Sequence, residues 1–167
     1  TYERLISLPV ILESIIIGDL VAGALFGIAI TTIVFVFCYE LLHLSIMNAA
    51  VLTVSFVLGS ITFAALGTLL SSPTTNNPSN IMMLSSLIRL PLIFISGIFI
   101  PLSQLSGWVL VLTMLSPLTY LVDLFNGAMN GNAVYPAWID MLVLLIVILV
   151  FIGSAKVIQK RNLVKGI

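Results

Sequence analysis

The sequence predicts an all-α integral membrane protein with four transmembrane helices. Hydrophobic residues make up 60 % of the 167 residues and charged residues only 7 %, and the mean hydropathy is +1.28. A water-soluble domain with a normal charged surface does not reach these values. Polar segments divide the chain into apolar runs near the length of roughly 20 residues that one crossing requires. As a single transmembrane domain, residues 1–167 have expected spans at 19–38, 49–70, 81–100 and 138–155.

The segment before the first span mixes charged and apolar residues. Residues 1–16 contain Glu3, Arg4 and Glu13, and Pro9 interrupts their Leu- and Ile-rich face. This pattern fits a short amphipathic helix at the membrane surface. The alternative is that the segment only leads into the first span.

The first two spans carry small residues at helical spacing. The first contains GALFG at 23–27, a small-xxx-small pattern that allows two helices to approach closely. The second has Ser55, Gly59, Phe63 and Gly67 four residues apart. We expect this face of the second span to be buried against another helix.

The third span contains one charge, Arg89, about 12 Å along the helix from Ile81. An arginine at that depth costs about 2–3 kcal/mol unless it finds water or a partner. We expect Arg89 either to extend its side chain to the nearer interface, or to face a carboxylate or an anionic part of a substrate.

The segment between the third and last spans contains apolar pieces too short to cross. Residues 108–115 and 118–125 each have about half the required length, and Ser116 and Pro117 separate them as a helix cap and a first helical residue. Residues 102–130 therefore predict a re-entrant helical hairpin, whose returning half carries Asp123. The alternative is a surface loop with a kinked amphipathic helix.

Basic residues predict the orientation of the chain. The tail, 156–167, contains Lys156, Lys160, Arg161 and Lys165, whereas the segments 39–48 and 101–137 contain no Lys or Arg. By the positive-inside rule the tail is cytoplasmic, and four spans place the N-terminal segment on the same side.

Several enzyme classes lack their sequence signatures here. There is no G-x-x-x-x-G-K-[ST] loop, H-E-x-x-H motif or CxxC pair, and Cys38 and His43 are the single residues of their types. We assign no catalytic residue and no metal site. No acidic residue lies in mid-span, as a proton-driven transporter would usually require, so we expect any transport energy to come from elsewhere.

Three segments resemble the permease subunits of type-2 ATP-binding-cassette (ABC) exporters. They are FISGIFIPLSQL at 94–105, LSPLTYLVDLFN at 115–126 and, more weakly, ERLISLPVILESIIIGDLVAG at 3–23. In this family a coupling segment precedes the third span of the full permease, to which the span at 19–38 corresponds here. An extracellular re-entrant hairpin precedes the last span. The chain departs from the family at Asp19, where Lys is frequent, and at Glu13, where a basic residue is frequent.

The resemblance implies a plasma-membrane permease for drugs, lipids or glycans, of which a first third with two spans would precede Thr1. Two permease copies, identical or different, would pair with ATP-binding subunits that hold ATP and Mg. The resemblance implies no cofactor bound by this chain and no nucleic-acid partner. The implied ATPase-coupling residues are Glu3, Arg4, Leu8, Pro9 and Glu13. The implied translocation-path residues are Arg89, Ser96 and Gly97. The implied hairpin residues are Pro101, Trp108, Ser116, Pro117, Tyr120 and Asp123.

The residues alone leave two alternative functions. A non-transport subunit that anchors or assembles a membrane complex would use the small-residue faces only for packing. An intramembrane enzyme is disfavoured by the missing catalytic motifs.

Overall fold

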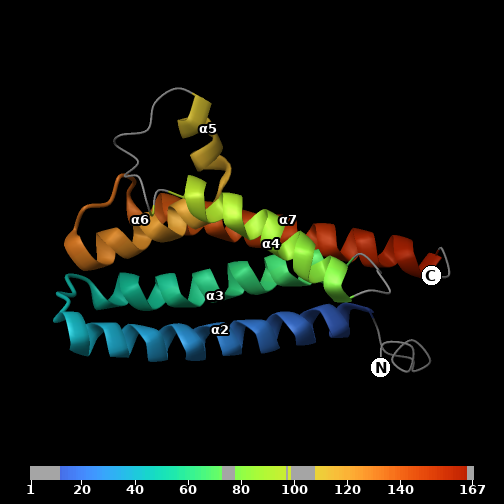
Figure 1. The fold of residues 1–167 in the computed structure, drawn as a ribbon, viewed down its shortest axis with the longest axis horizontal. Coiled ribbons are helices and arrows are strands. Elements are labelled where there is room, and N and C mark those ends of the chain that lie inside the picture. The colour runs from blue at the N-terminus through green and yellow to red at the C-terminus, as the bar shows by residue number, and fades with distance from the viewer. Residues whose placement is uncertain (1–11, 73–77, 97, 99–107, 165–167) are drawn as a thin grey trace.

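The described residues of the computed structural model are 12–72, 78–96, 98 and 108–164, and they are predominantly helical. The helices follow one another without a strand in this part of the chain (Figure 1). Their bounds are α2, Leu12–Leu42; α3, Ala49–Ser71; α4, Pro78–Ile95; α5, Trp108–Leu115; α6, Pro117–Asn130; and α7, Ala137–Val164.

Three of these helices are long and apolar enough to cross a bilayer. They contain the stretches Ile16–Leu42, Ala49–Ser71 and Ala137–Arg161. Many of their large apolar side chains are exposed, for example Phe26, Ile33 and Leu149 at 69–71 %. Such surfaces are unfavourable in water but suit a lipid environment. The fold is therefore that of a multi-pass helical membrane protein.

Helix α3 is the centre of the bundle, because α2, α6 and α7 all pack against it. The contact between α2 and α3 uses the expected small residues. A Cβ atom at Gly23 would lie 3.1 Å from the Cβ of Ala64, and one at Gly27 would lie 3.1 Å from the Cβ of Ser60. The two helices run antiparallel in a register that a larger residue at either glycine would disturb.

Helix α2 begins before the expected first span. It is unbroken from Leu12 to Leu42, so the last residues of the expected coupling segment, including Glu13, belong to the same helix as the span. Ile16, near this start, is 1 % exposed. Residues 1–11 lie outside the described residues.

Helices α4 and α6 together connect the two ends of the bundle. Helix α4 has 18 residues, of which Met82–Ile95 form the apolar part. Along the long axis of Figure 1 it starts near the end of α3, and α6 continues to the opposite end, while α5 stands apart from the layer of α3, α6 and α7. Helix α4 ends at Ile95, before the end of the expected span 81–100, and residues 97, 99 and 100 of that span lie outside the described part.

The polar turn between α2 and α3 is joined to α6 by hydrogen bonds. The backbone N–H groups of Met47 and Asn48 both donate to the carbonyl oxygen of Ala128, each at 3.0 Å. This contact ties the α2–α3 turn to the end of α6, next to the loop 131–136 that leads into α7. The start of α2 and the end of α7 lie at the opposite end (Figure 1).

Candidate functional site

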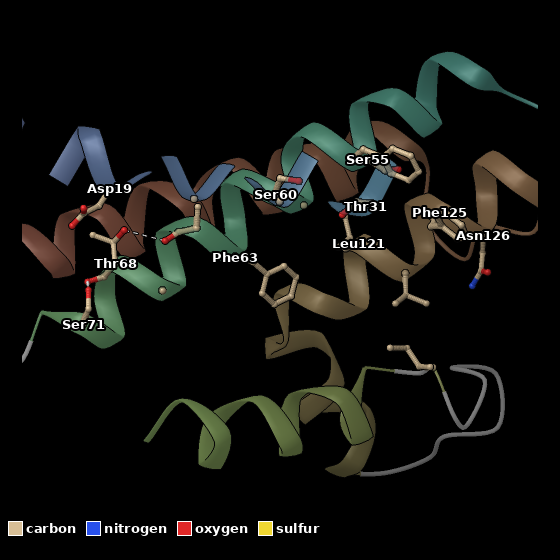
Figure 2. Close-up of a pocket in the computed structure, with 18 residues that line it drawn as sticks. Asp19, Thr31, Ser55, Ser60, Phe63, Thr68, Ser71, Leu121, Phe125 and Asn126 are labelled. Atoms are coloured by element: carbon tan, nitrogen blue, oxygen red, sulfur yellow. Dashed lines mark hydrogen bonds between the residues drawn. The ribbon is translucent and has the colours of Figure 1, made fainter. Parts of the chain in front are cut away.

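An open groove of about 1080 Å³ runs along α3 and is the candidate functional site. Helices α2, α3 and α6 supply most of its wall, and Figure 2 shows how their side chains surround it. The described lining residues are Asp19, Gly23, Gly27, Thr31, Ser55, Phe56, Gly59, Ser60, Phe63, Ala64, Gly67, Thr68, Ser71, Ile98, Leu121, Val122, Phe125 and Asn126.

The small-residue face of α3 is only half covered. Ser55 is 2 % exposed and donates a hydrogen bond to the carbonyl of Leu52, and a Cβ at Gly59 would lie 2.8 Å from a methyl carbon of Leu121 on α6. Phe63 is 36 % exposed, and a Cβ at Gly67 would meet no atom within 4 Å. The expected burial is therefore confirmed for Ser55 and Gly59 but wrong for Phe63 and Gly67, because α6 ends its contact there and the groove opens.

Polar groups occur along the groove, but its one described charged residue, Asp19, lies at one end. Figure 2 shows Asp19 with Thr68 and Ser71 at one end, and Phe125 and Asn126 at the other. The Thr68 hydroxyl donates to the carbonyl of Ala64 at 3.0 Å, and the Ser71 hydroxyl donates to the carbonyl of Thr68 at 3.0 Å. No Lys, Arg or His occurs among the described lining residues. The Asp19 end thus offers a carboxylate and two hydroxyl oxygens as acceptors, because the protons of these hydroxyls are already donated to backbone carbonyls.

The expected hairpin residues hold α5, α6 and the loop 131–136 together. Ser116 is the N-cap residue of α6 and Pro117 follows at its start, as expected, although the buried Ser116 hydroxyl makes no hydrogen bond within the described part. The Tyr120 hydroxyl donates to the carbonyl of Met114 at 2.8 Å, and the Thr119 hydroxyl donates to the carbonyl of Thr113 at 2.7 Å. These bonds join the first turn of α6 to the end of α5.

Asp123 is the anchor of the loop between α6 and α7. Its carboxylate is 2 % exposed and accepts hydrogen bonds from the backbone N–H of Val134, at 2.8 and 3.0 Å, and of Tyr135, at 2.8 Å. Charge-assisted bonds of this kind satisfy an otherwise costly buried carboxylate. Asp123 therefore holds backbone N–H groups of this loop against α6.

The sequence does not indicate Asp140 as a site residue. It lies in the first turn of α7, is 0 % exposed, and neither carboxylate oxygen accepts a hydrogen bond from a described residue. An acidic residue at the start of an apolar helix is usually read as an interfacial residue. Nothing in the local sequence distinguishes an outward from an inward orientation there.

The two described residues of the expected path, Arg89 and Ser96, lie away from the groove. Arg89 is exposed on α4, and Ser96 is fully buried, with its hydroxyl donating to the carbonyl of Ile93 at 2.7 Å. Neither lines the groove. The expected site residues Glu3, Arg4, Leu8, Pro9, Gly97 and Pro101 lie outside the described residues, and Trp108 begins α5. No cluster of three His, Cys, Asp or Glu side chains suited to a metal occurs among the described residues.

Apolar spans around an open groove, with one end bound together by backbone hydrogen bonds, define a multi-pass membrane protein with a cavity accessible between its helices. The family model of the ABC-2 type transporter matches residues 1–130, and the chain belongs to this family. No curated protein and no solved structure matches the chain. Family membership makes the chain a membrane permease component of an ABC transporter, a class that works with an ATP-binding-cassette subunit.

Proposed function

We propose that the chain forms part of the translocation path of an ATP-driven exporter, with a separate ATPase subunit as its energy source. The observation that supports this role is the open groove between α2, α3 and α6. It extends from the end where α2 begins towards the end of the bundle that carries the Asp123-anchored loop. A second permease copy would face the first and complete the path.

The coupling segment would transmit movement from the ATPase to the groove. In this proposal Glu3, Arg4, Leu8, Pro9 and Glu13 contact the ATP-binding subunit, which holds ATP and Mg. Helix α2 supports it, since 31 unbroken helical residues form a rod about 46 Å long. A displacement at Leu12 would reach Gly23 and Gly27, which pack against α3.

Helices α5 and α6 would close the outer end of the path. The hydrogen bonds of Tyr120 and Thr119 to the end of α5 support a hairpin that moves as one unit. This proposal takes the basic tail to be cytoplasmic, as the positive-inside rule predicts, which makes the opposite end of the bundle the outer one.

The test is ATP hydrolysis by the complete permease reconstituted with the ATP-binding subunit encoded beside it. One variant lacks residues 3–11, so that α2 is left intact from Leu12. A second variant replaces the same residues with a Gly/Ser linker of equal length, which keeps the chain length and removes the side chains; the unaltered permease is the control. We expect both variants to insert in the membrane, and hydrolysis stimulated by the permease to fall about fivefold or more.

Two results would contradict the proposal. If no ATP-binding subunit copurifies with the unaltered permease, the chain has no such partner, and an anchoring role becomes the better explanation. If both variants keep full stimulation, the N-terminal segment is not the coupling element.

A further inference from the structure

We infer that the groove selects a hydrophobic cation as cargo and that Asp19 is the residue that selects it; this inference rests on the proposed transport function. The cargo would be a molecule with an apolar body and one positive charge. Its charge would be recognised at the end of the groove where α2 begins, on the side proposed to face the cytoplasm.

The packing of α2 on α3 places Asp19 at the groove. Gly23 lies opposite Ala64, and Gly27 lies opposite Ser60. In an antiparallel pair this register puts Asp19, one turn before Gly23, level with Thr68. Figure 2 shows Asp19 at the same end of the groove as Thr68 and Ser71, and all three line it.

The Asp19 carboxylate has no described counterion. It is exposed to the groove and makes no ion pair or hydrogen bond with another described residue. Thr68 and Ser71 use their hydroxyl protons on backbone carbonyls of α3, so that only oxygen lone pairs remain for a ligand. This end of the groove therefore attracts a positive group and gives an anion neither a charge nor a described donor.

The wall beyond this end is mixed but holds an apolar surface. Phe63 projects into the groove, and Leu121 and Phe125 continue the apolar lining towards the other end. The polar residues of this part, Thr31, Ser55, Ser60 and Asn126, carry no charge. An aromatic ring also attracts a cation through its face. A phosphate-bearing molecule, such as a lipid-linked sugar, would instead meet Asp19 without a basic residue to offset the repulsion.

Tetraphenylphosphonium and tetraphenylborate provide a direct test, because they share size and shape and carry opposite charges. Equilibrium binding of each radiolabelled ion is measured on the purified, ATPase-bound permease in detergent. The variants are Asp19→Asn, which removes the charge with little change of shape, and Glu40→Gln. Glu40 is an exposed carboxylate on the same helix, away from the groove, and serves as the matched control.

We expect Asp19→Asn to weaken phosphonium binding about tenfold, as for one partly hydrated charge pair, and Glu40→Gln to leave it unchanged. Borate binding should not weaken in Asp19→Asn. The ratio between variant and unaltered protein cancels partitioning of each ion into detergent. A second variant, Gly67→Leu, fills the groove where a Cβ meets no atom within 4 Å, and it should remove phosphonium binding without loss of thermal stability.

Equal phosphonium affinity in the unaltered protein and in Asp19→Asn would overturn the inference, as would a phosphonium affinity that Gly67→Leu leaves intact. The groove would then be a packing surface for another helix or a second copy. Failure of the transport function is a separate result: it appears as absence of the ATP-binding subunit, whereas charge selection is read from binding alone.

Discussion

Two buried aspartates near the same end of the bundle show how strongly the surroundings of a residue decide its role. Asp123 and Asp140 are 2 % and 0 % exposed. Asp123 accepts hydrogen bonds from two backbone N–H groups of the following loop, whereas Asp140 accepts none from a described residue. A buried acceptor without a donor costs free energy, and a well-bonded one stabilises. The two side chains should therefore respond oppositely to removal.

We predict that Asp123→Ala lowers the free energy of unfolding by about 1–3 kcal/mol, because the N–H groups of Val134 and Tyr135 lose their acceptor. The matched variant Asp140→Ala should leave stability unchanged or raise it. Thermal unfolding of the purified protein in detergent compares the two. An equal loss in both variants would show that Asp140 has a stabilising partner beyond the described residues, and would contradict the predicted difference in stability.

At the scale of elements, the antiparallel pair of α2 and α3 depends on two glycines. A Cβ at Gly27 would lie 3.1 Å from the Cβ of Ser60, an atom held by the α3 backbone that cannot rotate away. We predict that Gly27→Leu separates the helices and destabilises the protein by about 1–3 kcal/mol. Gly153→Leu on α7 is the control, since a Cβ there meets no atom within 4 Å.

The melting temperatures of these two variants in detergent provide the measurement. Gly153→Leu should melt at or above the temperature of the unaltered protein, because it also removes a helical glycine. If Gly27→Leu melted with it, the α2–α3 register would not depend on the glycine contact. The placement of Asp19 opposite Thr68 would then lose its basis.

The sequence predicted the helices well and the site only in part. Apolar length and polar turns are local properties, so α2, α3 and α7 could be expected from them, and Ser116–Pro117 correctly separated α5 from α6. The four-residue spacing on α3 defined a face but not which helix covers it. That face is covered at Gly59 by Leu121 and open at Gly67. The groove, and with it the importance of Asp19, follows from this tertiary arrangement alone.

At the scale of the whole molecule, the path of the chain determines which segments lie on the same side of the membrane. Helix α2 runs towards the end with the turns 43–48 and 131–136, and α3 and α7 run away from it (Figure 1). Helices α4 and α6 must together return the chain to that end, since the Met47 and Asn48 N–H groups bond to Ala128 near the end of α6. The bundle therefore has its two polar turns at one end and its basic tail at the other.

We predict that Asn132, in the loop before α7, is extracellular and that Lys160, in the basic tail, is cytoplasmic. Both are exposed, and Cys38→Ser removes the native cysteine. In that background, Asn132→Cys should react with a membrane-impermeant maleimide in intact cells, and Lys160→Cys only after permeabilisation. Reversed labelling would invert the positive-inside assignment. Labelling of both from the same side would show that α7 does not cross the membrane. It would contradict the multi-pass arrangement, on which the assignment of a cytoplasmic and an outer end of the groove depends.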